Sequence, residues 1–363
     1  MPSNSSTDQL LRNCAWVELD EKTGDAIRRA CLVQRNWKKV VDEAELHGLS
    51  PYVNRSIKET GAQVPDETQR TLNALSLRHA RSGVIRTAAL LEIVREARRR
   101  DIDVLVLKGA ALAHLVYDNP GLRPMRDVDI LVGPEHLDKT AEVLANLGYR
   151  ATDHNALLPD HHHLPNMARE LDGLNVSVEI HHDALTPDNI GSIQVTSLSE
   201  PPREFTVDGV ALHALGHLDT LRHLCRHALE PRETMKLGSA LDIMLYACRF
   251  AGEIDWQRLK TAFPEVVTLL QLLGYLVPWP AGLSRFVPRP SDQAPEGVGT
   301  GMIPLSDLRR RNDRLARLLN PSDWWLRGFY NVPPGRSLAY TKALRHPLRV
   351  LFWLWRRRGK GLA

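Results

Sequence analysis

Two aspartates separated by one residue lie in a short apolar segment, Asp127 to Val132 (DVDILV). Alternation of this kind predicts a β-strand, in which side chains two positions apart leave the same face. Asp127 and Asp129 would therefore share the solvent-side face, because burying both carboxylates without partners is costly. Val128, Ile130 and Val132 would point into a core. Two carboxylates that converge on one face form a hard oxygen site suited to Mg²⁺.

A third carboxylate comes from a second predicted strand, residues 176–181 (VSVEIH), which alternates in the same way. Glu179 shares the polar face of this strand with Ser177 and His181. Three acidic groups on adjacent strands can hold one or two Mg²⁺ ions, or Mn²⁺ in their place, that bridge a triphosphate and an attacking hydroxyl. A lone pair of aspartates at a strand end is more often a solvated edge, so the surrounding sequence decides between the two interpretations.

The upstream sequence predicts a strand–glycine–helix turn. Residues 104–107 (VLVL) indicate a short buried strand, Lys108 and Gly109 end it, and helical composition follows. Such a turn presents backbone N–H groups at a helix N-terminus, where phosphate oxygens bind, and glycine permits close approach. This pattern is common by itself. It becomes more specific when Arg123 and Arg126 follow it and lead into the aspartate pair.

The stretch from 107 to 132, LKGAALAHLVYDNPGLRPMRDVDILV, resembles the uncharacterised nucleotidyltransferase family of the DNA polymerase beta-like nucleotidyltransferase superfamily. Similar features extend the resemblance to about residues 35–275. The resemblance implies transfer of a nucleoside monophosphate from an NTP to a hydroxyl of a small-molecule, sugar or peptide acceptor, with release of pyrophosphate. It implies Mg²⁺, with Mn²⁺ as the alternative, as the cofactor.

The resemblance also assigns roles to individual residues. Asp127 and Asp129 would bind the metal ions. Glu179 would complete the metal site and help to deprotonate the acceptor hydroxyl. Gly109 would hold the triphosphate.

The sequence departs from the superfamily pattern beside that glycine. The usual Gly-Ser pair is Gly109-Ala110 here, so a hydroxyl contact to phosphate is missing, and the interval from Gly109 to the aspartates is longer than in the simplest members. An alternative hypothesis therefore keeps the fold but makes the chain a non-catalytic nucleotide-binding or regulatory protein. The expected nucleotide-binding set is Lys108, Gly109, Ala110, Arg123 and Arg126.

Histidines near the second strand suggest an acceptor pocket. His163 and His181 are expected to line it or to carry protons. His181 and His182 are adjacent on a strand and point to opposite faces, so they do not readily share one ion. A histidine-metal hydrolase is a third hypothesis, and it requires stoichiometric zinc.

Other polar residues in the second half favour structural roles. Asp242, in an apolar helical segment, could orient the active site or pair with a nearby arginine such as Arg222, and pairing is the favoured expectation. Two histidine pairs have the four-residue spacing that can chelate a metal on a helix, but no third ligand stands at a recognisable spacing. These pairs are His213 with His217 and His223 with His227.

The order of predicted elements indicates an α+β fold, with a small mixed-sheet nucleotidyltransferase core flanked by N-terminal and C-terminal helical regions. A hairpin is expected to turn at Asp208-Gly209. The predicted organisation is an N-terminal helical region at 1–100, the nucleotidyltransferase core at 101–213, a helical domain at 214–283, a flexible linker at 284–304 and a basic C-terminal helical tail at 305–363.

Charge is distributed unevenly along the chain of 363 residues, whose formal net charge is +4. No acidic residue follows Asp323, whereas arginines and lysines continue to the end. The excess therefore lies outside the predicted site, and no nucleic-acid partner is expected. Residues 345–360 combine apolar side chains with arginines and suggest peripheral docking to a membrane or a protein. We expect a cytoplasmic protein, with membrane association only through this tail, because the N-terminus lacks a signal-peptide pattern.

Overall fold

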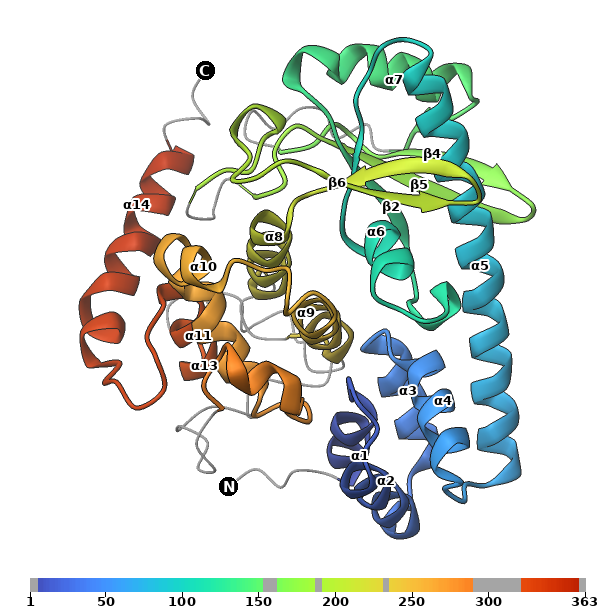
Figure 1. Ribbon diagram of the computed structural model, residues 1–363, viewed down its shortest axis with the longest axis vertical. Helices are drawn as coiled ribbons and strands as arrows, with labels where there is room; N and C mark the ends of the chain where they lie inside the picture. Colours follow the sequence, from blue (N-terminus) through green and yellow to red (C-terminus); the bar gives the residue numbers. More distant parts are fainter. Residues whose placement is uncertain (1–5, 153–161, 187–190, 231–234, 290–320, 359–363) are drawn as a thin grey trace.

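The computed structural model describes residues 6–152, 162–186, 191–230, 235–289 and 321–358. Figure 1 shows a mixed β-sheet at one end of the molecule and a larger group of helices at the other. One long helix, α5 (Asp66–Arg98), passes beside both parts. This arrangement confirms the predicted α+β class with a small mixed sheet.

The described sheet has seven strands in the order β3-β4-β5-β2-β1-β7-β6. At its centre β2 (Asp127–Leu131) runs parallel to β5 (Leu174–His181) and antiparallel to β1 (Leu105–Val106). The register places Asp129 directly opposite Glu179. The other strands are β3 (Arg150–Ala151), β4 (Met167–Leu171), β6 (Arg203–Val207) and β7 (Val210–Ala214).

The alternation predicted for the two central strands is confirmed. Val128, Ile130 and Val132 are fully buried in one apolar cluster, together with the valines and isoleucine of β5. Residues of α5 and of α7 (Leu137–Asn146) complete this cluster, so these helices cover that side of the sheet. Because side chains alternate, the acidic residues must leave the opposite face.

Local turn chemistry accounts for the hairpin at the edge of the sheet. Asp208 and Gly209 both have positive φ angles, 48° and 74°, as a tight two-residue hairpin turn requires. The predicted turn between β6 and β7 is therefore confirmed.

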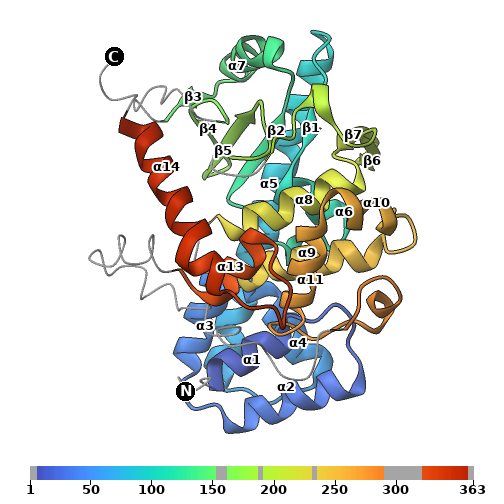
Figure 2. The same ribbon diagram turned by 90° about the vertical axis from the view of Figure 1, so that its left-hand side faces the viewer.

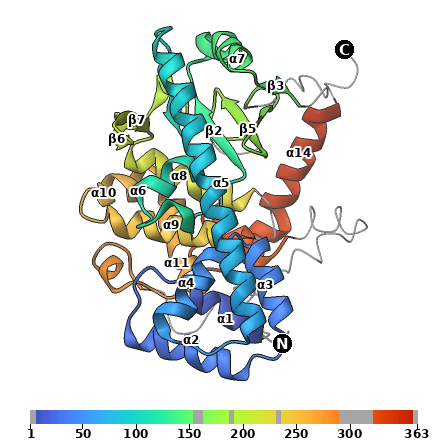
Figure 3. The ribbon, with the colours of Figure 1, turned by 90° about the vertical axis from the view of Figure 1, so that its right-hand side faces the viewer.

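The helices from the two ends of the chain share one hydrophobic core. Leu10 and Leu11 near the N-terminus belong to the same buried cluster as Tyr246, Trp324 and Trp325. Figure 3 shows the N-terminal helices stacked against this helical half. The helices with side chains in this core are α1 (Ser6–Cys14), α2 (Glu21–Val33), α3 (Trp37–Leu46), α4 (Ser50–Thr60), α5, α6 (Lys108–Leu115), α8 (His217–Leu229), α9 (Leu237–Arg249), α10 (Trp256–Ala262), α11 (Pro264–Leu273) and α13 (Asp323–Tyr330).

A final helix, α14 (His346–Arg358), follows a π-helical segment, Thr341–Arg345, and lies on the outside of the molecule (Figure 2). Among the helices of the described residues, none has the length and apolarity needed to cross a bilayer. Residues 290–304 of the predicted linker and 305–320 of the predicted tail lie outside the described residues. The domain boundaries stay a prediction.

A close backbone contact joins the N-terminal helices to α9. His47, which follows α3, is 7% exposed, and its Nδ1 accepts a hydrogen bond of 3.3 Å from the N–H of Leu237. Its carbonyl oxygen accepts another, of 3.0 Å, from the N–H of Gly238. A Cβ at Gly238 would lie 2.7 Å from that oxygen, so only glycine fits this junction.

Burial lowers the pKa of His47 to about 4, and the charges of Lys236 and Arg12 act in the same direction. Below the ordinary value of 6.5 the unfolded chain binds a proton at this site that the folded chain excludes. The free energy of unfolding should therefore fall as the pH drops from about 6.5 to about 4, by about 3 kcal/mol from this residue. Urea denaturation at a series of pH values measures this slope.

The variant His47→Asn keeps a hydrogen-bond acceptor but does not titrate, so its stability should depend less steeply on pH over the same interval. Carboxylates elsewhere contribute equally to the pH dependence of stability in the variant and in the wild type, so their effect cancels when the two profiles are compared. Parallel pH profiles for the two proteins would contradict the assignment.

Candidate active site

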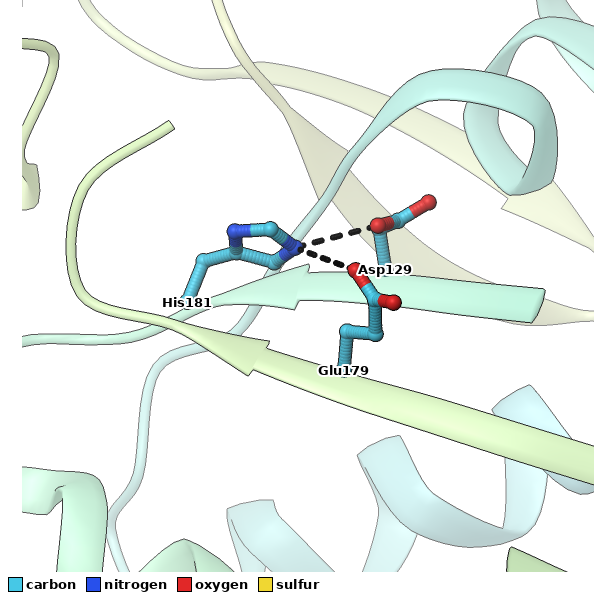
Figure 4. Close-up of side chains that lie close together, drawn as sticks. All are labelled: Asp129, Glu179 and His181. Atoms are coloured by element: carbon cyan, nitrogen blue, oxygen red, sulfur yellow. Dashed lines mark hydrogen bonds and ion pairs between the residues drawn. The ribbon is translucent and has the colours of Figure 1, made fainter. Parts of the chain in front are cut away.

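Three potential ligand groups meet on the face of the central strands opposite the α5 side. Figure 4 shows Asp129 from β2 with Glu179 and His181 from β5. One ligand atom from each lies within 4.8 Å of the others. The Nε2 atom of His181 is 3.0 Å from Oδ1 of Asp129 and 3.4 Å from Oε2 of Glu179. The predicted convergence of the second aspartate with Glu179 is therefore present in the structure.

Asp129 is more deeply buried than the sequence suggests, with 2% of its surface exposed. The expectation that both aspartates face solvent is wrong for this residue, because Lys108 and the buried His181 cover its carboxylate on that face of the sheet. In addition, β2 is an inner strand, with β5 and β1 on its two sides. The same position excludes the interpretation of the aspartate pair as a solvated sheet edge. Asp127, two residues earlier on the same strand, is partly exposed at the start of β2.

Lys108 supplies the nearest cation. Its Nζ lies 2.8 Å from Oδ1 of Asp129, and the N–H of Leu107 donates a 3.0 Å hydrogen bond to the backbone oxygen of the same aspartate. The backbone of Lys108 has a φ of 45°, in the left-handed region that costs a residue with a side chain about 1 kcal/mol. Lys108 is the first residue of α6, so the strained backbone belongs to the same residue whose side chain contacts Asp129.

The cations control the protonation of the cluster. Burial by itself raises the pKa of Asp129, but Lys108 and His181 outweigh it and hold that pKa well below its usual value. The hydrogen bond from His181 lowers the pKa of Glu179. The pKa of Asp127 is raised by burial and by repulsion from the other two carboxylates, and the charges of Lys108 and Arg123 offset this only in part. The ionised carboxylates can therefore lie close together because the positive charges of Lys108 and His181 offset their mutual repulsion.

The imidazole of His181 is stabilised in its charged form. Burial lowers its pKa, but the hydrogen bonds to Asp129 and Glu179 raise it above the usual value overall. This ring is fully buried, and the ring of His163 lies 5.2 Å away, centre to centre. The two histidines predicted for an acceptor pocket are thus neighbours beside the carboxylates, and their role toward an acceptor stays a prediction.

Two residues that the sequence reasoning missed support the site. Asn166 donates a 3.0 Å hydrogen bond from Nδ2 to Oε1 of Glu179. Arg86 of α5 is buried and donates from Nε and Nη2 to the carbonyl oxygen of Arg126, at 3.2 and 2.9 Å, just before β2. Neither has a motif that marks it, because each reaches the site only through packing between distant segments.

Arg123 and Asp242 form an ion pair in which the carboxylate is buried and the guanidinium is partly buried. The guanidinium Nε is 2.8 and 2.9 Å from the two carboxylate oxygens, Nη2 is 2.7 Å from Oδ2, and Tyr117 donates a 2.7 Å hydrogen bond to Oδ1. The expectation that Asp242 pairs with an arginine is confirmed, but the partner is Arg123 and not Arg222, because the fold brings α9 against the loop before β2. This guanidinium lies beside Gly109, where a Cβ would be 3.4 Å from Nη1, in van der Waals contact with it.

The other predicted nucleotide-binding residues are placed differently from one another. Ala110 is buried in the core of the sheet, and Arg126 is exposed. Of the two histidine pairs, His223 and His227 lie together on α8 with their ring centres 6.3 Å apart. His213 lies on β7 and His217 begins α8, so their expected placement on one helix is wrong. Among the described residues, the only group of three potential ligands within reach of one ion is the cluster in Figure 4.

The sequence matches the model of the family described as an uncharacterised nucleotidyltransferase over residues 34–274, about two thirds of the chain. The chain belongs to this family. The resemblance stated from the sequence is thereby confirmed, and family membership supports nucleotidyl transfer in general terms. No curated protein matches the chain.

Three solved structures resemble parts of this family member. The antibiotic-resistance factor ANT(2'')-Ia in solution is 13% identical, with 52% of this chain and 96% of that chain covered and a TM-score of 0.35. ANT(2'')-Ia in complex with adenylyl-2''-tobramycin is 14% identical, with coverages of 49% and 96% and a TM-score of 0.35. An antigenic nucleotidyltransferase-like protein from Paracoccidioides brasiliensis is 15% identical, with coverages of 53% and 91% and a TM-score of 0.36. The family assignment rests on the sequence match.

Removing Asp242 should destabilise the fold strongly, because Asp242→Ala leaves the largely buried guanidinium of Arg123 without its counter-ion and the buried hydroxyl of Tyr117 without its acceptor. The expected loss in the free energy of unfolding is about 3–5 kcal/mol, measured by urea denaturation. The exposed pair of Lys38 with Asp42 on α3 gives a matched control, since Asp42→Ala should cost less than about 1 kcal/mol.

A double variant separates loss of charge from loss of packing. Arg123→Met combined with Asp242→Leu removes both charges and should recover much of the stability lost by Asp242→Ala. If Asp242→Ala and Asp42→Ala lowered stability equally, the buried pair would not have the structural role described.

Proposed function

We propose that this protein is a metal-dependent nucleotidyltransferase that moves a nucleoside monophosphate from an NTP to a hydroxyl of a small-molecule, sugar or peptide acceptor and releases pyrophosphate. The observation that carries the proposal is the register of β2 with β5, which sets Asp129 opposite Glu179 on one face of the sheet. The Lys108-Gly109 turn lies beside this pair, at the start of α6.

The donor set fits a hard divalent cation. Asp129 and Glu179 lie opposite each other on paired strands and would contribute the carboxylate oxygens that Mg²⁺ and Mn²⁺ prefer. Asp127, two residues before Asp129 on the same strand, would add a third carboxylate. The ammonium of Lys108 already meets one of these oxygens, which is consistent with a position that attracts positive charge. A bound Mg²⁺ or Mn²⁺ would neutralise the charge of the triphosphate and favour the ionised acceptor hydroxyl.

The residues of the chain supply orientation and proton transfer. The acceptor oxygen bonds to the α-phosphorus, the bond from that phosphorus to the bridging oxygen breaks, and pyrophosphate leaves. We assign the acceptor proton to Glu179, whose carboxylate is held by Asn166 and kept ionised by His181. The backbone N–H groups at Gly109 are assigned to the phosphate oxygens.

A non-catalytic nucleotide-binding or regulatory protein is the second candidate. The observation that favours it is Ala110, which is buried and provides no hydroxyl for a phosphate. Calorimetry with each NTP, combined with a pyrophosphate assay, distinguishes the two functions. Tight binding without pyrophosphate release across a broad acceptor panel would favour the second candidate.

Neutralising the central carboxylate should abolish transfer. Asp129→Asn is expected to lower the rate at least about 100-fold, because the amide keeps the shape but loses the charge that binds the cation. The measurement uses α-labelled NTPs, Mg²⁺ or Mn²⁺ and pooled acceptors, with circular dichroism to check folding. Glu142→Gln, an exposed site on α7, is the control and should keep full activity. Equal transfer by wild type and Asp129→Asn would overturn the proposal.

Lys108 should compete with a metal for Asp129 in the absence of nucleotide. Lys108→Met removes this cation, so Mn²⁺ binding measured by electron paramagnetic resonance should tighten by about tenfold. Lys139→Met, at an exposed lysine on α7, is the matched control and should leave the affinity unchanged. An affinity for Mn²⁺ that stays equal or weakens in Lys108→Met would contradict this competition.

A further inference from the structure

Large apolar side chains are exposed in an unusual concentration near the C-terminus. Of the ten large hydrophobic residues that are exposed in the described part of the chain, six lie between 340 and 355. Scattered single residues of this type are normal, whereas a contiguous group marks an interaction surface. The six are Tyr340, Leu344, Leu348, Leu351, Phe352 and Trp355, which are 47–70% exposed.

Four of these residues form a stripe along α14, which we call the outer stripe. Leu348, Leu351, Phe352 and Trp355 follow the spacing i, i+3, i+4 and i+7, which places them on one face of a helix. Their exposed fractions are 55, 62, 56 and 70%. The helix therefore presents an apolar face away from the body of the protein, the reverse of an ordinary surface helix.

The opposite face of α14 is fixed to the protein. His346 and Val350 are buried, and Nδ1 of His346 lies 2.9 Å from the hydroxyl of Tyr330 on α13. The guanidinium of Arg349 on α14 lies 4.8 Å from the ring centre of Phe329 on α13. Figure 2 shows α14 running along the outside of the molecule. The outer stripe is thus held outward by a packed inner face.

The charge of this region selects one kind of partner. No acidic residue follows Asp323, while nine basic residues do. Two copies of a segment with this charge would repel each other, whereas an anionic surface would attract it. The basic residues are Arg327, Arg336, Lys342, Arg345, Arg349, Arg356, Arg357, Arg358 and Lys360.

We propose that the outer stripe of α14 docks the protein onto an anionic phospholipid surface. Leucine and aromatic side chains on one helix face, followed by an arginine cluster, form the pattern of a helix that lies in the interface between headgroups and acyl chains. The helix of 13 residues is about 20 Å long, too short to span a hydrocarbon core of about 30 Å. This docking is independent of the proposed nucleotidyl transfer.

Co-sedimentation of the full chain with vesicles tests the proposal. The protein should bind vesicles of phosphatidylcholine mixed with phosphatidylglycerol, bind weakly to phosphatidylcholine alone, and dissociate as the salt concentration rises. The double variant Leu348→Gln/Leu351→Gln should lower the affinity at least about tenfold. Both side chains are exposed, so the variant should fold normally.

The matched control places the same changes elsewhere. Leu32→Gln/Leu77→Gln alters two leucines on α2 and α5 that are 70 and 72% exposed, and it should bind vesicles like the wild type. Equal loss in both double variants, equal binding to the two kinds of vesicle, or no binding at all would overturn the proposal. A dimer in sedimentation velocity that Leu348→Gln/Leu351→Gln dissociates would assign the outer stripe to a second copy instead.

Discussion

The buried charge of Asp129 is the constraint on which the site depends. A carboxylate that is only 2% exposed has lost most of its hydration, and burial of this kind is tolerated only when cations and hydrogen-bond donors replace the lost water. Lys108 and His181 meet this requirement at the same carboxylate oxygen, one from the start of α6 and one from the end of β5. The left-handed backbone of Lys108 is a strained conformation that this interaction helps to maintain.

A second buried charge links the same region to the helical half. Arg123 precedes β2, while Asp242 lies on α9, and their pairing attaches the loop around the aspartates to the core that the two ends of the chain build together. The same guanidinium lies against Gly109 at the start of α6. The turn beside the carboxylates is therefore fixed by contacts that come from a distant part of the sequence, so the helical half acts as a scaffold for the sheet.

Local patterns in the sequence predict the elements, and pairing between distant elements determines what the patterns leave open. Strand alternation correctly separates Val128 and Ile130 from the aspartates, because the two-residue period acts within a single strand. The depth of Asp129 depends on which strands flank β2, and the partner of Asp242 depends on which loop packs against α9. Asn166 reaches Glu179 through the pairing of neighbouring segments. Such long-range contacts leave no trace in local periodicity.

The shared core also affects how the chain can fold during synthesis. Leu10 and Leu72 enter the same buried cluster as Trp324, so the first helices leave the ribosome long before all of their packing partners exist. At ordinary elongation rates this interval is on the order of tens of seconds. The apolar faces of α1–α4 must stay incompletely covered throughout that time. We therefore expect chaperones to shield these apolar faces on the nascent chain from aggregation until α13 has emerged.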